Sequence, residues 1–87
     1  MSWKVILSKQ AVKDLKSIKQ AGLAEKTRSL LEAIQGDPFV TPPRYESLVG
    51  NLKGYYSRRI NIKHRLVYSV DTDVQAIHVL RCWTHYE

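Results

Sequence analysis

The spacing of hydrophobic positions changes character along this chain. Residues 3–7 form a short apolar run rich in strand-forming side chains, which predicts a strand at an edge or in the middle of a sheet. Ser8 then offers a helix N-cap, and apolar residues recur at helical intervals up to a break at Gly22. A second helical pattern runs over 23–35 and ends at Gly36. The first 35 residues therefore predict a strand followed by a helical hairpin.

Residues 36–54 show no regular pattern. Helix- and strand-breaking residues recur through the segment, at Pro38, Pro42, Pro43, Gly50 and Gly54. A loop of this length in a compact domain usually has a function or is disordered. We therefore expect 36–54 to be one long loop, with Glu46 inside it.

Strand-like patterns return after residue 54. They predict strands over 55–60, 65–70 and 75–83, joined by short turns. In the last strand, the period of two places one set of side chains on one face, namely Ile77, Val79, Arg81, Trp83 and His85, and the other set on the opposite face, namely His78, Leu80, Cys82 and Tyr86. The predicted fold is α+β, a βαα unit followed by a three-stranded antiparallel meander, with the helices packed on one face of a small twisted sheet.

Composition narrows the class of protein. A chain of 10.1 kDa with 44% hydrophobic and 25% charged residues has the balance of one globular domain, which we take as 1–87. No apolar run approaches the ~20 residues of a membrane-spanning helix. The single cysteine, Cys82, cannot form an internal disulfide, as is typical of the reducing cytoplasm. We therefore expect a cytoplasmic protein that does not engage a membrane, with Cys82 as a buried apolar group.

The positive charge is concentrated in one quarter of the chain. The net charge is +6, and between 44 and 65 a single acidic residue, Glu46, stands among six basic ones, namely Arg44, Lys53, Arg58, Arg59, Lys63 and Arg65. Arginine forks suit phosphate geometry, so this segment favours a nucleic-acid surface. A solvated sheet face kept soluble by charge remains the alternative interpretation.

The motifs favour neither metal nor nucleotide chemistry. One cysteine and three scattered histidines lack metal-ligand spacing, and no glycine-rich phosphate loop is present, so we expect no metal and no cofactor. A ribonuclease that uses the 2′-hydroxyl of its own RNA substrate needs only a base, an acid and cations to hold the phosphorane charge. Glu46, Arg59, Arg65 and His85 could form such a set, although composition alone does not select them.

A longer motif is more specific. From Glu46 to Tyr68 the chain reads E-x-L-x-x-N-L-x-G-x-x-S-R-R-I-x-x-x-H-R-L-V-Y, and His85-Tyr86 follows near its end. This combination resembles the YoeB/Txe branch of the RelE superfamily, toxins of toxin–antitoxin pairs that cleave mRNA on the translating ribosome. The resemblance covers nearly the whole chain. It implies a metal-independent endoribonuclease that inhibits translation.

The resemblance also implies catalytic roles. Glu46 would be the general base, Arg65 would stabilise the transition state, and His85 would be the general acid. The alternative interpretation of Glu46 is an internal salt-bridge partner of the arginines. Without the resemblance, a histidine at position 85 is more often an ordinary surface residue near the end of the chain.

Four further residues are expected to contact RNA. Arg59 would hold phosphate, Tyr86 would stack on or position a base, and Arg58, on the opposite side of its strand, would be solvated or contact ribosomal RNA. The family often has a lysine three residues after the glutamate, where this chain has Val49. Lys53 would supply that charge from further along the loop.

The resemblance implies partners as well. We expect a cognate antitoxin of the Phd/YefM/Axe type, with an acidic or amphipathic segment that folds over the toxin, and docking at the 30S A site with mRNA. Homodimer formation stays open. The alternative function is a non-catalytic module of the same fold that blocks the ribosome or another target by binding.

The remaining aromatic and histidine residues are interpreted as structural. Trp3 and Trp83 are expected in the core, and His64 in a turn or bonded to the backbone. His78 is expected to lie on a strand face. None of these four is assigned to the site.

Overall fold

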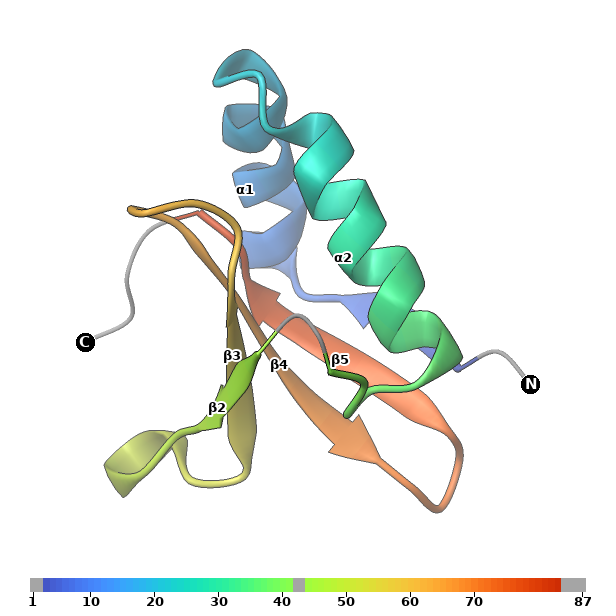
Figure 1. Ribbon diagram of the computed structural model, residues 1–87. Coiled ribbons are helices and arrows are strands. Elements are labelled where there is room, and N and C mark those ends of the chain that lie inside the picture. The colour runs from blue at the N-terminus through green and yellow to red at the C-terminus, as the bar shows by residue number, and fades with distance from the viewer. Residues whose placement is uncertain (1–2, 42–43, 84–87) are drawn as a thin grey trace.

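The structure is a computed structural model that describes residues 3–41 and 44–83. Along the chain, its elements are β1 (Lys4–Leu7), α1 (Lys9–Gln20), α2 (Ala24–Gly36), β2 (Tyr45–Ser47), the 3-10 turn Gly50–Leu52, β3 (Tyr55–Arg59), β4 (Arg65–Asp71) and β5 (Ala76–Arg81). The two helices form a hairpin that packs on one face of the sheet (Figure 1). The predicted α+β class is therefore confirmed.

The strands form one mixed sheet in the order β1-β5-β4-β3-β2. The pairs β2–β3, β3–β4 and β4–β5 are antiparallel, whereas β1 runs parallel to β5. The first and last strands of the chain are thus neighbours, and β1 is an edge strand. The predicted meander is confirmed as β3–β4–β5, and β2 adds a further strand at its other edge.

Ser8 begins α1 and attaches it to the sheet. Its Oγ accepts a hydrogen bond from the Ala11 N–H at 2.9 Å, which is the expected N-cap bond, and donates to the Leu80 carbonyl oxygen at 2.7 Å. Because Leu80 belongs to β5, this one hydroxyl both satisfies the helix start and fixes where the hairpin sits on the sheet.

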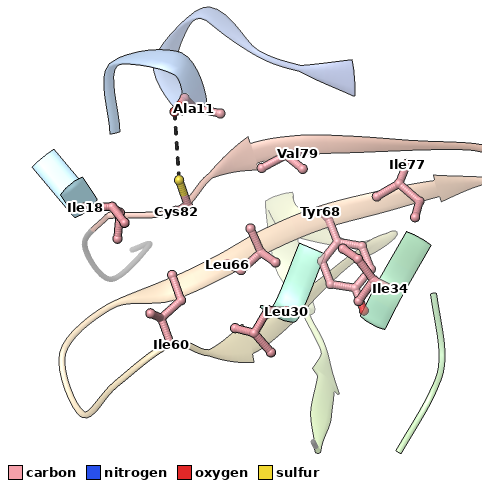
Figure 2. Close-up of a cluster of buried hydrophobic side chains, with 10 residues drawn as sticks. All are labelled: Ala11, Ile18, Leu30, Ile34, Ile60, Leu66, Tyr68, Ile77, Val79 and Cys82. Atoms are coloured by element: carbon pink, nitrogen blue, oxygen red, sulfur yellow. Dashed lines mark hydrogen bonds between the residues drawn. The ribbon is translucent and has the colours of Figure 1, made fainter. Parts of the chain in front are cut away.

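The core lies between the hairpin and the sheet (Figure 2). Its buried members are Ala11, Ile18, Leu30, Ile34, Ile60, Leu66, Tyr68, Ile77, Val79 and Cys82. Trp3 and Trp83 are partly buried against this cluster, in agreement with the sequence prediction. The Cys82 N–H donates to Asp14 Oδ2 at 3.1 Å, and its Sγ lies 3.8 Å from the Ala11 carbonyl oxygen. The chain just beyond β5 is therefore held against α1.

The expectation of a single loop over 36–54 was wrong. β2 lies within it and pairs with β3, with Tyr45 opposite Arg58 and Ser47 opposite Tyr56. Three residues are too few to show a strand periodicity, so only the neighbouring strand reveals this one. Glu46 is consequently held on a strand and not in a loop.

The predicted alternation along the last strand was also wrong beyond Val79. Tyr68 pairs with Val79, but Val67 pairs with Arg81, because the register shifts between these two pairs. A bulge adds one residue to a strand and reverses which face the following side chains occupy. Cys82 therefore joins Val79 in the core, whereas Arg81 lies on the same face as Val67.

Candidate active site

Charged side chains gather on the sheet face opposite the helices. Glu46 on β2 pairs with Ser57 on β3. Arg59, two residues further along β3, pairs with Arg65 on β4. Leu66, which follows Arg65, points into the core. Because side chains alternate between the two faces of a strand, Arg65 and its cross-strand partner Arg59 point away from the core. The antiparallel register thus brings together residues separated by up to 19 positions along the chain.

The centre of this group is an ion pair between β2 and β4. Arg65 Nη1 donates to Glu46 Oε1 at 2.8 Å and lies 3.3 Å from Ser57 Oγ. The Glu46 side chain is 51% exposed and that of Arg65 is 18% exposed. The carboxylate is therefore open to a ligand, and the guanidinium is held from below by a buried serine.

These side chains line a pocket of about 330 Å³. The described residues around it are Arg44, Glu46, Ser57, Arg59 and Arg65. Three guanidinium groups face one carboxylate, so after the ion pair is counted Arg44 and Arg59 still carry two positive charges. Such a site favours a phosphate-bearing ligand beside an acid–base group.

Two residues of the pocket were missed by the sequence analysis. The sequence indicated Arg44 only as one of the basic residues of 44–65, and it gave Ser57 no expected role in the site. The alternation along β3 could have indicated Ser57, because it lies two residues before Arg59 and therefore on the same face. Arg44 directly precedes β2, which no sequence pattern predicts, so the sequence did not indicate that Arg44 lies beside Glu46 in the pocket.

The structure contradicts the expected surface role of Arg58. Its side chain is 0% exposed and lies on the helix side of the sheet. Nε donates to Tyr68 Oη at 3.0 Å, and Nη2 donates to the Pro38 carbonyl oxygen at 3.0 Å. The guanidinium carbon also lies 5.0 Å from the centre of the Tyr45 ring. An arginine held in this way cannot reach RNA at the surface.

Arg58 instead supports the position of the pocket. The Pro38 carbonyl oxygen also accepts from Tyr68 Oη at 2.8 Å, which ties the segment after α2 to β4. The rings of Phe39, Tyr45 and Tyr56 lie with their centres 5.1 to 5.8 Å apart beside this network. Burial raises the pKa of the Tyr68 hydroxyl, and the Arg58 hydrogen bond opposes that rise. These contacts thus fix the segment after α2 and the first residue of β2, the strand that carries Glu46.

The remaining predicted residues are not brought into the pocket. Lys53 lines a separate hollow with Val49, whose side chain is 83% exposed, and with Tyr55 and Tyr56. His85 and Tyr86 lie outside the described residues. Of the predicted site, the structure therefore brings together Glu46, Arg59 and Arg65.

Neither a metal cluster nor a membrane span is found in the part of the chain that the structure describes. No three His, Cys, Asp or Glu side chains of residues 3–41 and 44–83 lie together in a way that could hold a metal ion. Over the same residues, neither helix has the length and apolar character needed to cross a bilayer.

Comparison with known sequences gives a consistent result. Residues 7–86 match the family model described as the YoeB-like toxin of bacterial type II toxin–antitoxin systems. The chain is 42% identical over 66 residues to Toxin YoeB of Synechocystis sp., covering 75% of this chain and 73% of that protein. It is 36% identical to Toxin YoeB of Escherichia coli K12, over 74% of each chain.

Solved structures extend the likeness to the fold. A YoeB/ParE toxin from Agrobacterium tumefaciens superposes with a TM-score of 0.86 at 32% identity, covering 95% of this chain and 99% of that chain. A heterotetrameric YoeB–YefM toxin–antitoxin complex from Staphylococcus aureus matches with a TM-score of 0.81 at 37% identity, over 99% of this chain and 100% of that one. A YoeB dimer from the same organism matches with a TM-score of 0.82 at 37% identity, with the same coverage.

Proposed function

Because this chain belongs to the YoeB-like toxin family of bacterial type II toxin–antitoxin systems, we propose that it cleaves mRNA in the ribosomal A site without a metal ion. The observation that carries the proposal is the pocket in which one carboxylate meets three guanidinium groups. A phosphodiester would fit there with its charge matched and with a proton acceptor beside it.

The reaction uses the RNA's own 2′-hydroxyl as nucleophile. Glu46 accepts the 2′-hydroxyl proton while the 2′-oxygen bonds to phosphorus. His85 donates a proton to the departing 5′-oxygen as the phosphorus–oxygen bond breaks. The products are a 2′,3′-cyclic phosphate on the 5′ fragment and a 5′-hydroxyl on the 3′ fragment.

The arginines stabilise the charge that develops on phosphorus. Arg65 serves this role at the centre of the pocket, because its Nη1 contacts Ser57 Oγ and also donates to the Glu46 carboxylate that accepts the proton. Arg59 and Arg44 hold the phosphate from the sides of the pocket. In the free toxin Glu46 forms an ion pair with Arg65, and an incoming phosphate would compete with Glu46 for the same guanidinium.

The partners follow from charge and from the family. A net charge of +6 favours association with ribosomal RNA, and the ribosome would position the mRNA backbone for in-line attack. The YefM complex of the staphylococcal relative supports a cognate antitoxin for this chain, and its dimer supports self-association. The site of action, the translating ribosome, implies a cytoplasmic location.

Primer extension on a defined mRNA tests the proposal. The protein is incubated with that mRNA in the presence and absence of ribosomes, beside His85→Ala and Arg65→Ala. We expect cleavage at the A-site codon only with ribosomes, a 5′-hydroxyl on the 3′ fragment, and loss of cleavage in both variants. Intact mRNA with translation nonetheless arrested would instead establish the blocking module.

A further inference from the structure

A hollow beside β5 lies apart from the pocket of the candidate active site. It has a volume of about 180 Å³. The residues that line this β5 hollow include Ile6 of β1, Tyr55 of β3, and His78 and Leu80 of β5. None of its lining residues also lines the pocket around Glu46. The two hollows are therefore separate, and the strand register decides how they are related.

The register places the β5 hollow on the same sheet face as the pocket. Tyr55 pairs with Ser69 on β4, and Ser69 pairs with His78 on β5. His78 in turn pairs with Ile6 on β1. Tyr55 precedes Ser57 by two residues, so its side chain points to the face of the pocket that Ser57 lines, about 7 Å further along β3. The β5 hollow and the pocket are thus neighbours on one face.

The side chains of this row differ in size and in chemistry. The short side chain of Ser69 stands between the larger ones of Tyr55 and His78, which leaves room between them. The side chain of Ile6 is 38% exposed and supplies an apolar wall. Neither the Tyr55 hydroxyl nor the His78 imidazole has a hydrogen-bond partner among the described residues. The β5 hollow therefore combines an aromatic ring and an apolar wall with two polar groups that are able to bind a ligand.

A basic residue stands between the β5 hollow and the pocket. Ser57 pairs with Val67 on β4, and Val67 pairs with Arg81, so Arg81 belongs to the same row of side chains as Ser57. Arg81 also directly follows Leu80, which lines the β5 hollow. The Nε atom of Arg81 is buried and has no hydrogen-bond partner among residues 3–41 and 44–83. A phosphate-bearing chain that crosses from the pocket to the β5 hollow would therefore pass a cation.

We propose that the β5 hollow binds the nucleobase of a nucleotide next to the scissile phosphate of the mRNA; this inference rests on the proposed function. When the arginines of the pocket hold that phosphate, the row of Tyr55 lies within reach of the neighbouring nucleotide. A nucleobase has an apolar ring face and polar edges. The ring of Tyr55 and the Ile6 side chain suit the face, and His78 with the Tyr55 hydroxyl suits the edges.

The position of the β5 hollow favours RNA over a protein segment as its occupant. The hollow lies one row away from a pocket suited to a phosphodiester, and Arg81 stands between the two. A single-stranded nucleic acid is bound where cations follow its backbone and aromatic side chains stack on its bases. An apolar peptide segment would bury the Tyr55 hydroxyl and the His78 imidazole without giving them partners.

A double-mutant cycle between the protein and the RNA tests the inference. Ribosome-bound mRNAs carry an abasic nucleotide directly 5′ or directly 3′ of the cleaved bond, and single-turnover cleavage is measured for the wild type and for Tyr55→Ala. We expect the abasic nucleotide at one of these positions to slow the wild type by about tenfold or more, because a base–aromatic stack is lost. Tyr55→Ala should slow cleavage of the intact mRNA by a similar factor. The same abasic mRNA should slow Tyr55→Ala by less than about twofold further, because both changes remove one interaction.

Matched variants separate the β5 hollow from the rest of the protein. Ile6→Ser changes an exposed apolar residue that lines the hollow, whereas Val12→Ser changes an exposed apolar residue of α1, on the helix side of the sheet. We expect Ile6→Ser to reduce both the rate and the effect of the abasic nucleotide, and Val12→Ser to leave both at wild-type values. Tyr55→Phe keeps the ring and should keep most of the rate. Thermal midpoints are recorded for all variants, and Ile6→Ser serves if Tyr55→Ala fails to fold.

The outcomes distinguish this inference from the proposed function. Wild-type cleavage that an abasic nucleotide slows at neither position would overturn the inference and leave the proposed function standing. Losses from Tyr55→Ala and from the abasic nucleotide that multiply in full would do the same, because the residue and the base would then act separately. A wild-type rate of Tyr55→Ala together with a loss of dimer in sedimentation would overturn the inference in favour of a second copy of the chain as the occupant. Absence of cleavage by the wild-type protein on every mRNA would overturn the proposed function and the inference with it.

Discussion

Arg65 Nη1 lies 2.8 Å from Glu46 Oε1, and the same nitrogen lies 3.3 Å from Ser57 Oγ. This contact joins β2 to β4 across β3, so the one carboxylate among the described residues of the pocket is paired with the guanidinium at its centre. A substrate phosphate must share or displace that contact. In the free toxin the proposed base, Glu46, is therefore paired with the central arginine, Arg65, and we expect a bound phosphate to separate them.

Glu46→Gln should separate catalysis from stability. We expect the cleavage rate to fall by roughly 10²- to 10⁴-fold, because the amide cannot accept the 2′-hydroxyl proton. The free energy of unfolding should change by less than about 0.5 kcal/mol, because the pair is partly exposed to water. Single-turnover cleavage and thermal unfolding check both parts, with Glu25→Gln on α2 as the control. Retention of the wild-type rate by Glu46→Gln would remove its role as the base.

Arg44→Ala should weaken phosphate binding. Arg44 is an exposed residue at the rim of the pocket, so we expect a loss of about fivefold in affinity for ribosome-bound mRNA, or ~1 kcal/mol. The slope of log affinity against log salt should fall by about one unit. Arg28→Ala, the same change on the exposed side of α2, is the comparison. Equal effects of the two substitutions would mean that Arg44 contributes only to overall charge.

Arg58→Met and Arg59→Met should behave differently although the residues are adjacent. The Arg58→Met variant loses the buried hydrogen bonds to Tyr68 and Pro38, each worth about 1.5–3 kcal/mol because the donor is charged. We expect its melting temperature to fall by about 10 °C or more. Arg59 is exposed, so its variant should melt within about 3 °C of the wild type while losing RNA cleavage. Differential scanning calorimetry decides this, and equal melting temperatures would contradict the assignment.

Cys82 should be chemically inert in the folded protein. Burial, together with the nearby Asp14 carboxylate, raises the pKa of its thiol to about 12, so only about one part in 10⁴ is thiolate at pH 8. Thiol-specific reagents should react slowly with native protein and quickly after unfolding in guanidinium. Since the folded pKa lies above the unfolded value, this group favours the folded state below pH 9 and that contribution is lost as pH rises toward 12. Rapid labelling at pH 8 without denaturant would show that the site opens.

Much of this molecule could be predicted from sequence because its signals are local. The N-cap at Ser8 and the apolar stripes of the two helices depend on neighbours a few residues apart, and both are confirmed. The motif from Glu46 to Tyr68 was specific enough to indicate the family that the comparisons support. Fold class, meander and three of the pocket residues followed from these signals.

What the sequence could not reveal depends on contacts between distant residues. β2 is too short to have a pattern of its own, and it exists because β3 offers unpaired backbone groups beside it. That pairing alone places Arg44 beside Glu46. The adjacent arginines 58 and 59 look alike in sequence, but the buried partners of Arg58 come from Pro38 and Tyr68, 20 and 10 positions away.

The bulge at the end of β5 shows the same limit. Counting by two along the strand placed Cys82 opposite Val79, whereas one extra residue in the register against β4 returns it to the core. In this protein, local periodicity and a long motif determined the elements and the family. Register, burial of charge and the composition of the pocket were decided by the tertiary structure, because backbone pairing and the cost of desolvating an unpaired charge depend on residues far away in the chain.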